Sequence, residues 1–533
     1  MLPVRQCSEP AVKNQTEIEL KFLVPRAARA RILAEMSRGA TPLERISLAA
    51  TYLDTDDRRL ARVGLAWRLR REGRHWIQTL KGPGANPLER FEHEVMRPDA
   101  THDAMQHADT AAGRQLIAIL DEARVDGVEL EARFWTNVRR SVRRIRTRGA
   151  VVDIAFDEGR LSAADSTQRI LEIEFELNSG STAALLALAE RWRKRFGLIY
   201  DPRSKSERGD LLAQGVAYAP LRKAIQPRYS RRASAHEAFG VVVDECLGQI
   251  TRCAIGVVDG DSNLRVEHVH QLRVGIRRLR SALRGFRAWV KAPPADLVDR
   301  LRELFATLGR SRESDVLGSG VAVELAKVGA PPLNLPTDVT APDPADVIKA
   351  GETQKTLLDW IAWRAKLAEE ADVEYRAMAS VQDPTAVDDN HTPSTKKLRA
   401  RRDTPGFHRS AERRLRRWHE RIVADWKVFD ELDEAGLHVL RKQIKRQRYA
   451  VEFFASALRT RQAGRYLNAL GTIQNRMGEL NDLFVARTQY QGLVQSDPAA
   501  WFALGWLAAR IAEVRALAKR ELGVLSKVDP PSR

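Results

Sequence analysis

The first 220 residues alternate apolar and polar side chains along short segments, which predicts β-strands. Consecutive side chains of a strand point to opposite faces, so each segment has one apolar and one polar face. We predict strands at Glu17–Lys21, Thr51–Leu53, Ala66–Arg71, Trp76–Lys81, Phe91–Val95, Thr136–Ile145, Val151–Phe156 and Leu171–Leu177. Helical periodicity interrupts them near Arg26–Met36, Ala112–Ala123 and Thr182–Phe196. Eight strands with few helices favour a sheet that closes on itself.

From about residue 222 the apolar positions recur every three or four residues, which predicts helices. The predicted helices cover 235–257, 263–290, 295–311, 345–379, 407–430, 434–460, 463–492 and 499–525. Two stretches rich in Pro, Asp and Thr, 329–345 and 382–405, read as surface loops. The second part of the chain is therefore expected to be entirely helical.

Charge sharpens this division. The 533 residues carry a formal net charge of +18, of which +5 lies in residues 1–220 and +13 in 221–533. Such an excess favours a polyanionic partner, which could be nucleic acid, an anionic membrane or a phosphate polymer. Three cysteines argue against a disulfide framework. No apolar run reaches the ~18 residues that span a bilayer, so we expect a cytoplasmic protein without a membrane span.

An internal repeat occurs in the helical part. The segment from His270 to Arg280 recurs from His438 to Arg448, with an offset of 168 residues at each paired basic position. In each copy the basic residues gather on one helical face, within an arc of roughly 80° in the first copy, and the apolar residues gather on another. A repeat of this kind implies two similar halves that pack together.

A solvated helix face is the simplest alternative for these basic stripes. Such faces usually mix both signs of charge, because opposite charges four residues apart gain about 0.2–0.5 kcal/mol and like charges lose a similar amount. Two stripes of cations in register favour a bound polyanion instead. Neither stripe has interleaved aromatic residues or a base-reading element, so sequence-specific nucleic-acid binding is not indicated.

The repeated helix, together with Leu480-Asn481-Asp482, resembles the CHAD domain over about 232–525. The resemblance implies a double four-helix bundle whose basic groove binds inorganic polyphosphate. The groove residues that it implies are His270, Arg273, Arg277, Arg280, Arg284, His438, Arg441, Lys445 and Arg448. Asp315 and Asp482 would hold basic side chains in place.

The strands of the first part carry charges on one face. Glu172, Glu174 and Glu176 share a face, and Glu17, Glu19 and Lys21 share another. A half-exposed antiparallel sheet with outward charges would show the same alternation. However, neighbouring carboxylates about 7 Å apart repel one another unless cations lie between them. If the sheet closes with its charges inward, it forms a polar tunnel whose cations suit phosphate and whose carboxylates suit Mg²⁺ or Mn²⁺.

An ordered series of motifs in residues 15–212 resembles the CYTH superfamily of triphosphate tunnel metalloenzymes. The matching segments are Glu17-x-Glu19-x-Lys21, Tyr52-Leu-Asp54-Thr55, Trp67-Arg68-Leu-Arg70, Gln78-Thr79-Leu-Lys81, Arg90-Phe-Glu92-His-Glu94, Thr136-Asn-Val-Arg139, Asp153 to Asp157, Glu172-Ile-Glu174-Phe-Glu176, and Asp201 to Gly209. The resemblance implies an eight-stranded antiparallel β tunnel with flanking helices, and thus an α+β multidomain protein.

Site roles follow from this resemblance, residue by residue. The expected metal ligands are Glu17, Glu19, Asp153, Glu172, Glu174 and Glu176, with Mg²⁺ or Mn²⁺ as the cofactor and two ions per site. The expected triphosphate-binding residues are Lys21, Arg68, Arg70, Lys81, Arg139 and Lys205. Glu17, Glu19, Lys21, Glu92, Glu94 and Lys205 are the expected catalytic residues, and Glu92 or Glu94 would order the cations or the attacking water.

We therefore expect an N-terminal extension at 1–14, a tunnel domain at 15–215, a basic linker at 216–231, a helical domain at 232–525 with repeats at about 235–380 and 407–525, and a tail at 526–533. The expected function is metal-dependent hydrolysis of inorganic tripolyphosphate to pyrophosphate and phosphate, with long-chain polyphosphate bound by the helical domain at polyphosphate granules. Three alternatives stay open: a non-catalytic granule-binding protein, a thiamine triphosphatase or adenylyl cyclase, and non-specific nucleic-acid binding.

Overall fold

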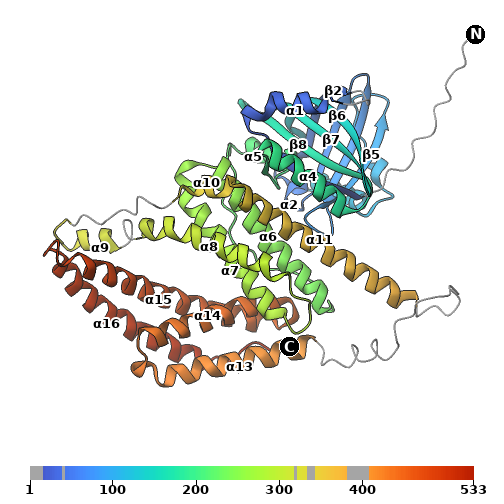
Figure 1. Ribbon diagram of the computed structural model, residues 1–533. Coiled ribbons are helices and arrows are strands. Elements are labelled where there is room, and N and C mark those ends of the chain that lie inside the picture. The colour runs from blue at the N-terminus through green and yellow to red at the C-terminus, as the bar shows by residue number, and fades with distance from the viewer. Residues whose placement is uncertain (1–15, 39–42, 317–320, 333–341, 381–406, 533) are drawn as a thin grey trace, which may run out of the picture. The chain divides into compact units, whose positions relative to one another are not determined.

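The computed structural model describes residues 16–38, 43–316, 321–332, 342–380 and 407–532 (Figure 1). The chain divides into two compact units. The first comprises Met1–Arg222, Thr251–His268 and Ile348–Ala368, and the second comprises Lys223–Ile250, Val269–Val347 and Glu369–Arg533. The expected extension at 1–14 and the expected loop at 382–405 lie outside the described residues, and the other domain boundaries stay predictions.

Eight antiparallel strands of the first unit close into a barrel. Their order is β5-β4-β3-β2-β6-β7-β8-β1, and β1 returns to pair with β5, with Thr16 opposite Phe91. The strands are β1 (Thr16–Leu23), β2 (Glu44–Thr55), β3 (Ala66–Glu72), β4 (His75–Pro83), β5 (Glu89–Arg97), β6 (Leu130–Thr147), β7 (Ala150–Ala163) and β8 (Ser166–Gly180), with a two-residue β9 (Ile199–Tyr200) beside β1. The predicted closed sheet is confirmed, and each predicted strand lies within an observed one.

The apolar faces of these strands point out of the barrel, where helices cover them. These helices are α1 (Arg29–Met36), α2 (Arg59–Arg62), α3 (Ala111–Val125) and α4 (Thr182–Phe196), and the fifth helix of this region is α5 (Lys205–Ala213). Phe22 and Phe175 meet edge to face, 5.7 Å apart, in a core that α1 and α4 complete. Trp67 packs with Leu116 of α3 in a second core. Because successive side chains of a strand face opposite ways, the polar residues that alternate with these apolar ones point into the barrel.

Helix α5 differs from the other helices because it packs against the inner face of a strand. Leu212 joins Phe134 of β6 in a buried cluster. Gly209 lies so close to Phe134 that an added Cβ would meet its ring at 2.1 Å, so a larger residue would push the helix away. This packing brings Lys205, the first residue of α5, to the barrel interior.

The rest of the described chain is helical, as predicted. The helices are α6 (Ala235–Asp259), α7 (Arg265–Phe286), α8 (Ala295–Val316), α9 (Ala322–Lys327), α10 (Pro344–Lys349), α11 (Gly351–Ser380), α13 (Phe407–Lys427), α14 (Glu434–Phe454), α15 (Thr460–Leu493) and α16 (Ala500–Leu525). The two copies of the repeat are α7 and α14. Within the described part of the chain, no helix is long and apolar enough to cross a bilayer.

Candidate functional site

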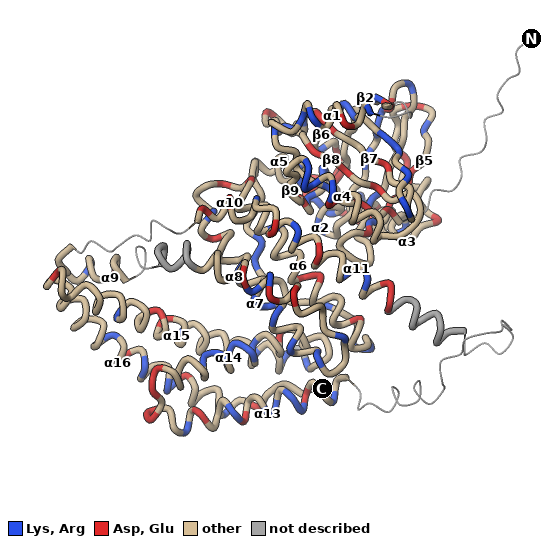
Figure 2. The backbone as a smooth tube through the Cα atoms, in the orientation of Figure 1, with Lys and Arg blue, Asp and Glu red and all other residues tan. Residues whose placement is uncertain are grey.

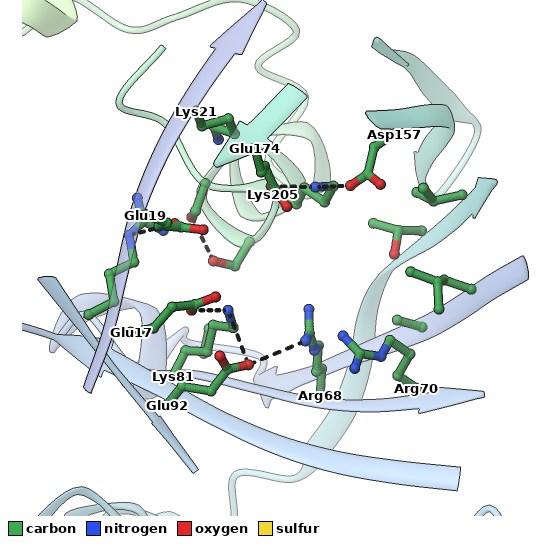
Figure 3. Close-up of a pocket in the computed structure, with 18 of the residues that line it drawn as sticks. Glu17, Glu19, Lys21, Arg68, Arg70, Lys81, Glu92, Asp157, Glu174 and Lys205 are labelled. Atoms are coloured by element: carbon green, nitrogen blue, oxygen red, sulfur yellow. Dashed lines mark hydrogen bonds and ion pairs between the residues drawn. The ribbon is translucent and has the colours of Figure 1, made fainter. Parts of the chain in front are cut away.

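A cavity of about 110 Å³ lies inside the barrel, and its described lining contains seven cationic and seven acidic side chains (Figure 3). Eleven of the residues assigned from sequence line it, namely Glu17, Glu19, Lys21, Arg68, Arg70, Lys81, Glu92, Glu94, Glu174, Glu176 and Lys205. They come from β1, β3, β4, β5, β8 and α5. The closed sheet therefore gathers side chains of both signs into one buried space.

Lys205 is the centre of the most acidic part of this cavity. Its Nζ lies 2.6 Å from Asp157, 2.5 Å from Glu172 and 2.8 Å from Glu174. Arg140 binds Asp157 through both nitrogens at 2.8 and 2.7 Å and contacts Glu174 at 2.6 Å. Burial alone would raise the pKa of Glu174, but Lys205 and Arg140 hold this pKa well below its ordinary value. The same two cations lower the pKa of Asp157 against the effect of its burial, so protein cations hold Asp157 and Glu174 in the ionised form.

The opposite part of the cavity holds a second ionic network. Lys81 lies 2.8 Å from Glu17 and 3.2 Å from Glu92, and Arg68 lies 3.7 Å from Glu92. Burial, together with the charges of Glu19 and Glu92, raises the pKa of Glu17 well above its ordinary value despite Lys81. Lys21 is 5% exposed, and burial lowers its pKa. Protons are thus held less firmly by Lys21 and more firmly by Glu17 than in water.

Three charged residues that were not assigned from sequence line the cavity, namely Arg90, Arg140 and Asp157. On β6 the inward side chains are Thr136, Val138 and Arg140, whereas the expected ligand Arg139 is exposed on the other face. The assignment of Arg139 was wrong by one position, since side chains alternate along the strand. Counting in steps of two from Thr136 would have found Arg140.

On β7 the expected metal ligand Asp153 lies outside the cavity lining, where it binds Arg144 at 2.8 and 2.7 Å. Asp157, four residues later on the same face, lines the cavity instead. It lies opposite Glu172 in the antiparallel register, whereas Asp153 lies opposite Glu176 near the strand end. Sequence alone does not show which of two acids on one face reaches the centre of a barrel.

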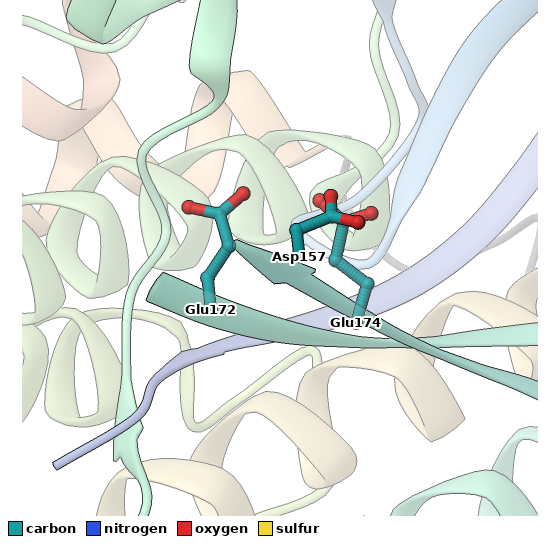
Figure 4. A group of neighbouring side chains, drawn as sticks. All are labelled: Asp157, Glu172 and Glu174. Carbon is teal, nitrogen blue, oxygen red and sulfur yellow. The ribbon is translucent and has the colours of Figure 1, made fainter. Parts of the chain in front are cut away.

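The three carboxylates of Asp157, Glu172 and Glu174 offer ligand atoms within 4.8 Å of one another (Figure 4). Carboxylate oxygens are the ligands that Mg²⁺ and Mn²⁺ prefer, so this donor set fits such an ion. Binding of an ion by these carboxylates depends on Lys205. The ammonium of Lys205 already contacts all three carboxylates, so an ion and this lysine would share or exchange their oxygens.

Contacts from the helical segments of the first unit hold the chain around Lys205. Arg252 of α6 binds Glu207 of α5 through both nitrogens. Arg203, which is buried, contacts Asp259 at 2.7 Å, and the amide nitrogen of Tyr200 donates to Gln354 at 2.9 Å. Arg252, Asp259 and Gln354 lie outside 15–215, so the surroundings of Lys205 include residues beyond the predicted tunnel domain.

A second candidate site is a cavity of about 940 Å³ in the second unit, here called the groove. Of the nine residues assigned to a basic groove, the structure gathers seven there, from both copies of the repeat: His270, Arg273, Arg277, His438, Arg441, Lys445 and Arg448. Arg280 is absent from this lining and Arg284 lines another cavity. Asp482 lines the groove, and the side chain of Asp315 lies outside the described residues.

Crowding of cations marks the groove. Burial, with the charges of Arg441 and Arg277, lowers the pKa of Lys445 to about 7. Arg273 stacks over the ring of Phe305 at 4.6 Å, and His438 is 3.2 Å from Asn481. A bound anion would restore the proton to Lys445 and relieve the repulsion.

Family models match both parts of the chain. The family model of the CYTH domain matches residues 15–209, and that of the CHAD domain matches residues 241–491. An inorganic triphosphatase from Haemophilus influenzae is 28% identical over 169 residues, which are 32% of this chain and 47% of that protein. The chain thus matches about half of the length of this relative.

A solved structure, the CHAD domain from the plant Ricinus communis, is 26% identical, covers 59% of this chain and 99% of that domain, and has a TM-score of 0.44.

Glu17→Gln and Glu174→Gln should change the stability of the metal-free protein in opposite directions. The raised pKa of Glu17 costs stability as pH rises above about 4.5, so Glu17→Gln should gain stability relative to wild type as pH rises above this value. The lowered pKa of Glu174 contributes stability that is present above about 4.5 and lost as pH falls below it. Glu174→Gln should therefore lose about 3–5 kcal/mol near pH 7.

Urea unfolding in EDTA at several pH values measures both effects. Destabilisation of the same size in the two variants, with the same pH dependence, would contradict the assigned charge states.

Proposed function

Because the chain carries a CYTH domain at residues 15–209 followed by a CHAD domain at 241–491, we propose that it is a metal-dependent triphosphatase that also binds polyphosphate. The observation that carries the proposal is the balance of charge in the barrel cavity, whose seven cations are matched by seven acids. A triphosphate alone would bring several unmatched negative charges into this buried space. The acids therefore favour entry of the triphosphate together with divalent cations.

Inorganic tripolyphosphate is the substrate that the lining favours, with pyrophosphate and phosphate as products. Tyr52 is the only aromatic residue in the described lining. Its ring stacks on Phe134 at 4.5 Å and its hydroxyl accepts a hydrogen bond from Arg68 at 3.4 Å. No free ring is therefore offered in the described cavity to a nucleobase or a thiamine.

The side chains divide the work by charge. Arg68, Arg70, Lys81 and Arg140 would hold phosphate oxygens, which arginine can bind through two nitrogens at once. Asp157, Glu172 and Glu174 would hold Mg²⁺ or Mn²⁺, which supplies neutralising charge and lowers the pKa of water. When phosphate binds the cationic member of an ion pair, the carboxylate of that pair becomes available to the metal ion. When the metal ion binds the carboxylate, the cation becomes available to phosphate.

Polyphosphate binding by the groove is the second part of the proposal. The groove has cations from both repeats and a volume of about 940 Å³, large enough for an extended polymer. We infer that this site keeps the protein at polyphosphate granules, where chains of this polymer are concentrated.

Arg140 and Arg139 form a matched pair of substitutions for the catalytic proposal. Arg140→Gln should lower kcat/KM for tripolyphosphate by about 100-fold or more, because it removes a cavity cation and leaves Asp157 without its bidentate partner. Arg139→Gln removes the same charge from the outer face and should change kcat/KM by less than about twofold. Phosphate release with Mg²⁺ and with EDTA gives the measurement, with ATP and thiamine triphosphate as competing substrates.

If the wild type released no phosphate in a metal-dependent manner, and Glu19→Ala lowered phosphate release no further, the chain would be better explained as a non-catalytic binding protein. Faster turnover of ATP or thiamine triphosphate would contradict the choice of substrate.

Polyphosphate affinity should fall as pH rises through about 7, because the free groove loses the proton of Lys445 there. Lys445→Arg keeps its charge and should show a shallower pH dependence from about pH 6 to about pH 8. His270 and His438 stay in both proteins, so a difference between the two curves reports the residue at position 445. Fluorescence polarisation of labelled long-chain polyphosphate measures the affinity. Identical slopes for the two proteins would contradict the role of Lys445.

A further inference from the structure

A second basic cavity, here called the arginine pocket, lies in the second unit apart from the groove. It has a volume of about 400 Å³ and shares no lining residue with the groove. Its arginines are Arg284, Arg287, Arg414, Arg417, Arg421 and Arg446. They come from α7 and the residue just after it, from α13 and from α14, the helices along which Figure 2 marks many basic positions.

No carboxylate is present in the described lining of the arginine pocket, and none of its six arginines has an ion-pair partner among the described residues. The groove differs, since Glu452, Glu479 and Asp482 contribute to its lining. Burial and the charges of Arg280 and Arg446 lower the pKa of Arg284. The pocket thus concentrates positive charge that the protein itself does not neutralise.

Aromatic rings hold two of these arginines in place. Arg414 stacks over Trp289 at 4.6 Å and donates to the carbonyl oxygen of Gly285. Arg446 stacks over Trp418 at 5.6 Å. Because a guanidinium lies over one face of Trp418, that face is closed to a stacked nucleobase, and the six arginines favour a ligand rich in phosphate.

The internal repeat provides a comparison within the same chain. With the offset of 168 residues, Arg284 corresponds to Glu452 and Arg446 corresponds to Arg278. Arg278 and Glu452 form a buried ion pair at 2.6 Å. At the related position the same two helices instead bring Arg284 near Arg446, whose charge adds to the effects of burial and Arg280 in lowering the pKa of Arg284. One repeat thus has a carboxylate where the other has a second arginine.

We propose that the arginine pocket is a second phosphate site, which binds one stretch of an inorganic polyphosphate chain while a neighbouring stretch lies in the groove. This inference rests on the proposed polyphosphate binding by the groove. The basic face of α7 connects the two cavities. Arg277 lines the groove, and Arg284, about 10 Å further along the helix, lines the pocket.

Arg284→Glu in the full-length protein tests this proposal directly. It places a carboxylate beside Arg446, as in the Arg278–Glu452 pair, and should raise the Kd for long-chain inorganic polyphosphate about tenfold at ~0.15 M salt. Arg461→Glu makes the same change of charge at an exposed position of α15 outside both cavities, and should change Kd by less than about twofold. The thermal unfolding midpoint reports folding, and Arg284→Gln is a milder second variant.

The results separate this inference from the proposed function. A larger loss in Arg284→Glu and Arg284→Gln than in Arg461→Glu supports the arginine pocket. If these three variants bound polyphosphate as tightly as the wild type while Lys445→Gln bound it more weakly, the proposed role of the arginine pocket would be overturned and that of the groove would stand. Unchanged binding in Lys445→Gln as well would overturn both. Loss of affinity for single-stranded DNA without loss for polyphosphate would also overturn the pocket.

Discussion

Pairing of β1 with β5 is the constraint on which the tunnel depends, because it turns a charged sheet face into a closed interior. In an open sheet Glu17, Lys81 and Glu92 would lie in water and their interactions would be weak. Inside the barrel they lose hydration, so each charge needs a partner of opposite sign. Closure also forces the apolar alternate residues outward, which explains why helices cover the outer surface.

The two candidate sites handle buried charge in different ways. In the barrel, Lys205 and Arg140 are paired with carboxylates, so the interior is close to neutral and accepts both a phosphate and a cation. In the second unit, Lys445 and Arg284 lie among other cations, and burial together with these charges lowers their pKa values. The first arrangement suits reaction of a small anion with a metal ion, and the second suits binding of a long anion without one.

Periodicity was enough to predict the strands, the long helices and the two basic stripes, because each depends on local spacing. It failed where the position within the closed barrel decides the outcome. Arg139 and Arg140 are neighbours on one strand, and only the direction of the pleat separates the exposed from the inward one. Asp153 and Asp157 share a face, and only the register with β8 shows that Asp157 meets Glu172. The arginine pocket combines α7, α13 and α14, so it is a tertiary feature that no local pattern reveals.

The central claim is that the acidic part of the tunnel binds a divalent cation together with its substrate. Titration of Mn²⁺ tests this claim, with binding followed by electron paramagnetic resonance in the presence and absence of tripolyphosphate. We expect tripolyphosphate to tighten Mn²⁺ binding, Asp157→Asn to weaken it about tenfold or more, and Asp153→Asn to leave it nearly unchanged. Mn²⁺ binding that responds neither to tripolyphosphate nor to Asp157→Asn would contradict the account.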